Sequence, residues 1–62
     1  MKYSEVERKL KKAGCNWFRN GKRHPIWHSQ ITGKYFELSY HDSQEVKPGT
    51  LSSISKSSGV KL

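Results

Sequence analysis

Cysteine, acidic residues and long apolar runs are all scarce in this sequence of 62 residues. The single cysteine, Cys15, excludes an intramolecular disulfide and a cysteine-rich zinc motif, so we expect a buried structural thiol. No apolar stretch approaches the ~20 residues of a membrane-spanning helix, and the first residues lack the apolar core of a signal peptide. These absences predict a cytoplasmic protein with no membrane segment.

The small number of acidic residues leaves a strongly basic chain. Twelve lysines and arginines stand against five aspartates and glutamates, which gives a formal net charge of +7. Such charge favours nucleic acid, an acidic protein or an anionic membrane as a partner, and the membrane is the weakest of the three. A chain this short buries only about 60% of the surface that its unfolded form exposes. We therefore expect one domain over residues 1–62 with an open, shallow functional site.

Two segments have the pattern of a helix. The first begins at about residue 4, where Ser4 and Glu7 match a capping box, and ends at Gly14. The second covers about residues 49–58, and Gly59 ends it. The expected apolar faces consist of Val6, Leu10 and Ala13 in the first helix and of Leu51 and Ile54 in the second.

Three short segments between these helices have the aromatic and alternating composition of strands. They cover residues 15–19, 25–30 and 34–40, and Phe36, Leu38 and Tyr40 share one side of the third. With few aliphatic residues available, we expect the two tryptophans, three tyrosines and two phenylalanines to supply much of the core. The order helix, three strands, helix predicts an α+β fold, a two-layer α-β-β-β-α sandwich with an antiparallel meander.

Three separated motifs occur in order along the chain. They are Lys9-Leu10-Lys11-Lys12-Ala13-Gly14, then His24-Pro25-Ile26-Trp27, then Tyr40-His41 followed by Lys47-Pro48-Gly49-Thr50-Leu51 with Ile54 and Gly59 in step. Together they resemble the HicA-type toxins, the mRNA interferases of bacterial type II toxin-antitoxin systems. One difference is that Lys22 and Arg23 stand between Gly21 and His24, where the family usually has Gly-Ser or Gly-Gly before the histidine.

This resemblance has implications for fold, activity and partners. It implies a fold similar to double-stranded-RNA-binding domains and cleavage of mRNA that needs no metal ion or other cofactor. The catalytic residue would be the histidine at the position of His24. A HicB-type antitoxin would inhibit the toxin by covering the site, so that a toxin that is monomeric alone becomes part of a hetero-oligomer.

The residues around His24 fit this chemistry. Imidazole titrates near neutrality, so it can act first as a base toward a 2′-hydroxyl and then as an acid. Lys22 and Arg23 can hold a phosphodiester and stabilise the charge of a phosphorane, and Arg23 can contact two oxygens at once. Taken alone, His24 also fits an exposed residue with no function. The family motif favours the catalytic interpretation.

Other cations and aromatic residues have two interpretations each. Lys9 and Lys12 on the first helix form either a solvated face or contacts with RNA phosphates. Trp27 and Tyr35 are either core residues, the simpler interpretation, or exposed groups on which bases stack. The sequence predicts RNA contacts for the two lysines and leaves the two aromatic residues open.

Gly21 and His41 are candidate accessory residues beside His24. His41 would reach His24 only if the strand register brings its loop close, and a loop hydrogen bond or a contact with RNA or a partner is simpler. His28 lies roughly 13 Å along the strand from His24 at ~3.3 Å per residue, too far to share one phosphate. A zinc site that includes Cys15 is disfavoured because no pair of ligands has finger-like spacing.

These observations leave a leading hypothesis and two alternatives. The leading hypothesis is a metal-independent endoribonuclease toxin that cleaves mRNA and is silenced by its antitoxin. The first alternative is a non-catalytic RNA-binding module of the same fold, whose affinity falls steeply with salt. The second is an interaction protein whose basic surface binds only an acidic protein. Cleavage of RNA separates the first hypothesis from both alternatives.

Overall fold

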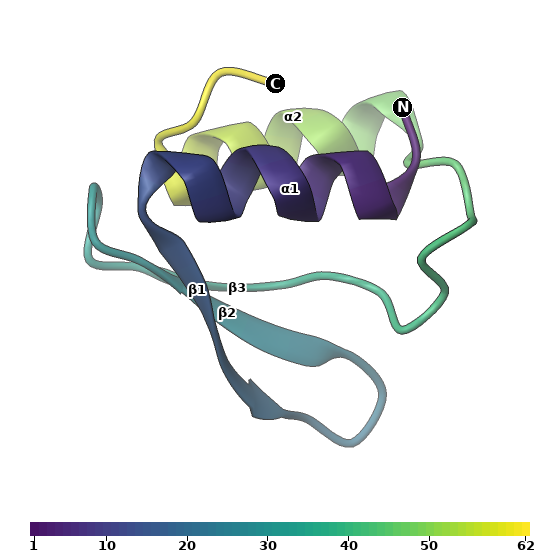
Figure 1. Ribbon diagram of the computed structural model, residues 1–62, viewed down its shortest axis with the longest axis horizontal. Helices are drawn as coiled ribbons and strands as arrows, with labels where there is room; N and C mark the ends of the chain where they lie inside the picture. The colour runs from purple at the N-terminus through teal and green to yellow at the C-terminus, as the bar shows by residue number, and fades with distance from the viewer.

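In the computed structural model, two helices lie on one side of a three-stranded sheet (Figure 1). The structure describes residues 1–62. In chain order the elements are α1 (Tyr3–Ala13), β1 (Cys15–Asn20), β2 (Pro25–Ser29), β3 (Tyr35–Glu37) and α2 (Pro48–Ser58). The sheet is antiparallel with the strand order β1-β2-β3. The predicted α+β class and α-β-β-β-α order are confirmed, and the arrangement is consistent with a fold like that of double-stranded-RNA-binding domains.

Helix α1 begins differently from the prediction. Its N-cap is Lys2 and no side chain caps it, so the capping box of Ser4 and Glu7 is wrong. Instead, the backbone N–H groups of Tyr3 and Ser4 donate to the carbonyls of residues 44 and 42, at 3.1 and 3.0 Å. The loop before α2 therefore satisfies the free amides of the first turn. The C-terminus is as predicted, since Gly14 adopts the left-handed conformation (φ 106°) that stops the helix.

The strand register divides the sheet into a covered face and an open face. Trp27 on the central strand lies opposite Trp17 on β1 and Phe36 on β3, and Trp27 and Phe36 are buried toward the helices. The open face carries the alternate residues of β2 and β3, whose cross-strand pairs are Ile26 with Glu37 and His28 with Tyr35. The register of β1 shifts by a bulge between Trp17 and Arg19, which leaves Phe18 unpaired.

The third strand is shorter than predicted. It ends at Glu37. The predicted alternation of buried and exposed residues would bury Tyr40, but Ser39 is buried instead and Tyr40 is 46% exposed. The chain leaves the sheet after Leu38, and the Tyr40 hydroxyl donates to the Gly21 carbonyl at 2.9 Å. Tyr40 therefore supports the turn between the first two strands. The other predicted element boundaries differ from the observed ones by a single residue.

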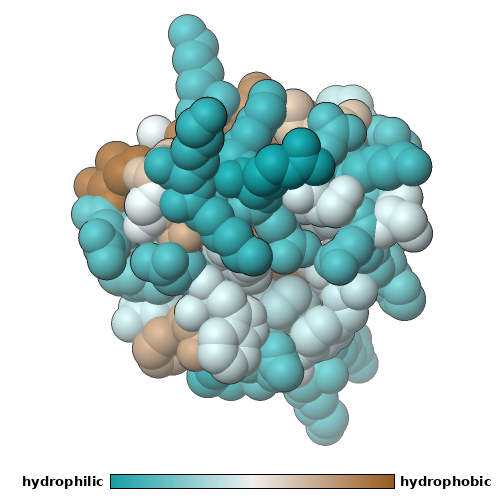
Figure 2. Space-filling view, viewed as in Figure 1, coloured by the Kyte–Doolittle hydropathy of each residue, from teal (hydrophilic) through white to brown (hydrophobic).

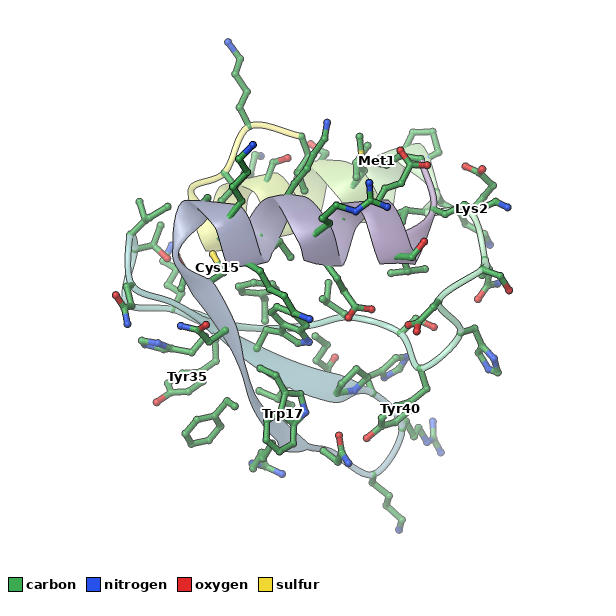
Figure 3. All side chains as sticks on the ribbon, viewed as in Figure 1. Met1, Lys2, Cys15, Trp17, Tyr35 and Tyr40 are labelled. Atoms are coloured by element: carbon green, nitrogen blue, oxygen red, sulfur yellow. The ribbon has the colours of Figure 1, made fainter.

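The core is small and largely aliphatic. Its eight buried residues are Val6, Leu10, Cys15, Trp27, Phe36, Leu38, Val46 and Ile54. The buried thiol of Cys15 is confirmed, and in Figure 3 it lies between the helices and the sheet. The expectation that the aromatic residues supply much of the core is wrong, because only Trp27 and Phe36 are buried. Ala13, expected on the apolar face, is exposed at the last turn of α1.

Two hydroxyl groups attach the end of α2 to the turn after β2. The buried Ser29 hydroxyl donates to the Ser58 carbonyl at 2.5 Å and accepts the backbone N–H groups of Ile31 and Thr32. The Thr32 hydroxyl donates to the carbonyl of residue 57 at 2.6 Å. These bonds satisfy carbonyls that the helix end leaves free. They hold α2 against the sheet although its own sequence is rich in serine.

Candidate active site

The turn between β1 and β2, residues 21–24, is closed by a hydrogen bond from the Gly21 N–H to the His24 carbonyl at 2.9 Å. A Cβ atom on Gly21 would lie 2.6 Å from that carbonyl oxygen and 3.2 Å from the Ile26 side chain. Only glycine fits such a close approach. The Tyr40 hydroxyl also donates a hydrogen bond to the Gly21 carbonyl. The close approach to His24 and this hydrogen bond make Gly21 the residue that shapes the turn carrying His24.

The turn borders an open surface depression of about 560 Å³. Its lining residues are Arg19, Gly21, Lys22, Arg23, His24, Ile26 and Glu37. The structure thus brings together four of the residues predicted for the site, the histidine, its two preceding cations and Gly21. His24 itself is exposed, and it directly precedes β2. A phosphate could enter this depression without displacing any buried side chain.

Two residues of the depression were missed by the sequence analysis, Arg19 and Glu37. Arg19 comes from β1 and Glu37 from β3, and both lie beside Ile26 in the strand pairing. Arg19 adds a third cation to the lining, and Glu37 adds a carboxylate. Alternation along β3 predicts that Glu37 and Phe36 lie on opposite faces of the sheet, but only the strand register brings Glu37 to the same depression as His24. The depression therefore contains a carboxylate and an imidazole as well as three cations.

The remaining predicted site residues lie elsewhere. Lys9 and Lys12 are exposed on α1, and they do not line the depression. Figure 2 shows that the side chains over this helix form a broad hydrophilic surface. His41 is exposed in the loop after β3, where its backbone N–H donates to the Ser39 hydroxyl at 3.0 Å, and it too lies outside the depression. These three residues therefore do not belong to the group that surrounds His24.

The carboxylates with shifted pKa values lie away from His24. Partial burial, and then the neighbouring Asp42 carboxyl, raise the pKa of Glu7, whereas Lys11 lowers it. At the N-terminus the Met1 ammonium donates to the Glu45 carboxylate at 2.8 Å and lowers the pKa of Glu45. Neither residue lines the depression around His24. Both pKa shifts therefore arise where the N-terminal part of the chain meets the loop between β3 and α2.

No three side chains among the histidines, cysteine, aspartates and glutamates lie close enough together to hold a metal ion. Cys15 is buried, and His28 lies on the open face beside Tyr35. Neither helix has the length and apolar character needed to span a bilayer.

The fold and the loop site define a small basic domain of the α-β-β-β-α class with an exposed histidine among cations. The model of one protein family, described as HicA toxin of bacterial toxin-antitoxin, matches residues 3–60. This match covers almost the whole chain, and the protein belongs to the HicA toxin family. Comparison with curated proteins and with solved structures found no match. The resemblance predicted from the three sequence motifs is confirmed.

Proposed function

We propose that this protein is the endoribonuclease toxin of a type II toxin-antitoxin pair, which cleaves mRNA in the cytoplasm without a metal ion. The observation that supports this most is the depression in which exposed His24 lies among Lys22, Arg23 and Arg19. Membership of the HicA toxin family supports the role as a toxin. A HicB-type antitoxin would inhibit the enzyme by covering this open depression.

In the proposed mechanism, His24 accepts the proton of the RNA 2′-hydroxyl. The 2′-oxygen attacks the adjacent phosphorus, the bond to the 5′-oxygen breaks, and the leaving oxygen takes up the proton from His24, whose imidazole returns to the neutral form. The products are a 2′,3′-cyclic phosphate and a 5′-hydroxyl. Lys22 and Arg23 stabilise the negative charge that develops on the phosphorane, an effect that is strong where cations are already in place. Lys22 and Arg23 are held in place because they belong to the turn that the hydrogen bond from Gly21 to His24 closes.

Glu37 is the proposed partner of His24. When the imidazole takes up a proton it becomes a cation, and a carboxylate in the same depression stabilises that cation. Glu37 belongs to a strand rather than to the turn, and its pairing with Ile26 holds its backbone in place. It would therefore act as a positioning residue that favours proton transfer to His24.

Cleavage in the presence of EDTA tests the proposed function directly. We expect the purified protein to cut mRNA in excess EDTA into fragments with 2′,3′-cyclic phosphate and 5′-hydroxyl ends, because His24 and the cations of the depression supply the chemistry. End-group analysis of the products and denaturing gels measure the outcome. Cleavage that stops on chelation, or fragments that carry 5′-phosphates, would contradict the mechanism.

A change at Glu37 tests its role. We expect Glu37→Gln to lower kcat about tenfold, which corresponds to ~1.4 kcal/mol of transition-state stabilisation. The KM for RNA should change much less than kcat, because the proposed role of Glu37 is in proton transfer and not in binding the phosphate. Glu5→Gln, an exposed residue on α1, is the matched control and should leave both kcat and KM unchanged. An unaltered kcat in Glu37→Gln would remove Glu37 from the mechanism.

The exposed cations of α1 support a second candidate function, an RNA-binding module without catalysis. Its cations are Arg8, Lys9, Lys11 and Lys12. Such a module would bind RNA with an affinity that falls by about 0.7 log units per log unit of salt for each phosphate of a single strand contacted. Binding of this kind with no product in the cleavage assay would favour it over the nuclease.

A further inference from the structure

The open face of the sheet carries large aromatic side chains in contact with solvent. Phe18 is 51% exposed and Tyr35 is 56% exposed, in a protein whose core has only eight residues. In Figure 3, Tyr35 lies on the side of the strands away from both helices. Figure 2 shows a small hydrophobic patch at the lower left of a mainly hydrophilic surface. Exposed aromatic side chains that contact one another are a feature of interaction surfaces.

These side chains form one continuous aromatic row across the sheet. The centroid of the Tyr35 ring lies 4.9 Å from that of the Phe18 ring, and the two ring planes meet edge to face at 68°. The centroid of the His28 ring lies 4.7 Å from that of Tyr35. Phe18 comes from β1, His28 from β2 and Tyr35 from β3, so the row crosses all three strands. The bulge in β1 leaves Phe18 outside the regular pairing, and its ring reaches Tyr35 on the open face. We call Phe18, His28 and Tyr35 the aromatic row.

The aromatic row adjoins the depression around His24. The pair Ile26 and Glu37 lines the depression, and the pair His28 and Tyr35 lies two residues further along the same two strands. Residues two apart share a face and are separated by about 6.6 Å at ~3.3 Å per residue, so the row begins about 6.6 Å beyond Ile26 and about 13 Å from His24. A strand of RNA with one phosphate at His24 can therefore run along the open face and place nucleotides further along over the row.

We propose that the aromatic row stacks unpaired bases of RNA beside the phosphate bound at His24, which makes single-stranded RNA the substrate. Aromatic rings on a sheet surface bind the faces of unstacked bases, whereas a duplex hides those faces and is recognised by its shape and backbone. The surrounding charge fits RNA, since Arg19 lies beside the row on β1 and the exposed Lys34 precedes Tyr35. This inference rests on the proposed function only in the position of the bound phosphate.

Binding of a short single-stranded RNA made uncleavable by 2′-O-methyl groups tests the proposal without cleavage. We expect Phe18→Ala and Tyr35→Ala each to raise its Kd about tenfold, as expected for the loss of one stacked base. Tyr35→Phe keeps the ring and should bind like the unmodified protein. Trp17→Ala is the matched control, because Trp17 is 53% exposed but lines a different depression, with Glu7 and Lys11. A duplex of the same sequence should bind more weakly and show no dependence on the two rings.

The outcomes separate this proposal from the proposed function. If Phe18→Ala and Tyr35→Ala bind the single strand as tightly as the unmodified protein while that protein cleaves mRNA, the aromatic row is overturned and the nuclease stands. If binding depends on the rings but mRNA is never cut, the nuclease fails and the row stands. Equal ring dependence for the duplex would overturn single-strand selection. Loss of antitoxin binding alone in the ring variants would also overturn the proposal. Circular dichroism checks that each variant is folded.

Discussion

Replacing His24 by alanine is expected to lower the rate of RNA cleavage by about 10²- to 10⁴-fold, the usual contribution of a general acid-base group. The imidazole is exposed at the edge of the depression and lies outside the core, so the fold should not change. Exposed substitutions of this kind typically alter the free energy of unfolding by no more than about 0.5 kcal/mol. Single-turnover cleavage in EDTA measures the rate, and thermal unfolding followed by circular dichroism measures the stability.

His41→Ala provides the comparison for this variant. His41 is also exposed, but it belongs to the loop after β3 and does not line the depression. We expect its loss to change the rate by only a few-fold, through weaker contact with bound RNA. If His24→Ala cleaves as fast as the unmodified protein, the mechanism is wrong. If His41→Ala loses as much activity as His24→Ala, the depression alone does not contain the catalytic groups.

Gly21→Ala is expected to reduce cleavage by about 100-fold although it removes no reacting group. The added Cβ atom would lie 2.6 Å from the His24 carbonyl oxygen, so the turn must move and the hydrogen bond that closes it must lengthen. A displacement of about 1 Å at a catalytic group is enough for such a loss of rate. Overpacking of this kind also costs about 1–3 kcal/mol of folding free energy. Cleavage kinetics and urea unfolding measure the two effects.

Gly49→Ala is the matched control for the turn. Gly49 lies in the first turn of α2, its φ angle is not positive, and a Cβ atom there meets nothing within 4 Å. Alanine is the better helix former, so this variant should be as stable as the unmodified protein or more stable, by up to about 1 kcal/mol. A Gly21→Ala protein with unchanged activity would show that the turn geometry does not control the position of His24.

Much of the fold follows from local patterns. The apolar face of α1 at Val6 and Leu10, and the helix stops at Gly14 and Gly59, depend on helical periodicity and on the left-handed conformation that glycine favours. Both signals act over a few residues, so the sequence alone predicts them. The candidate catalytic turn benefits in the same way, because Gly21 through His24 are consecutive and must lie together whatever the rest of the chain does.

The features that the sequence analysis missed all depend on residues far apart in the chain. The amides of the first turn of α1 are satisfied by carbonyls of residues 42 and 44, so a local capping pattern at Ser4 had no role. Tyr40 is exposed, and its hydroxyl donates to the carbonyl of Gly21, which is 19 residues away in the sequence. The core contains fewer aromatic residues than the sequence predicts for the same reason, since hydrophobicity alone does not tell which face of a strand the helices cover.

By itself, then, the sequence determined the order of the elements, the family, and the grouping of Lys22, Arg23 and His24 on one turn. Only the tertiary structure decided what surrounds that turn. Strand pairing brings Arg19 and Glu37 to the depression that the turn borders, and Phe18, which the bulge in β1 leaves unpaired, contacts Tyr35 further along the open face. The physical reason is the register of an antiparallel sheet, in which a slip of one residue would move each of these side chains to the opposite face.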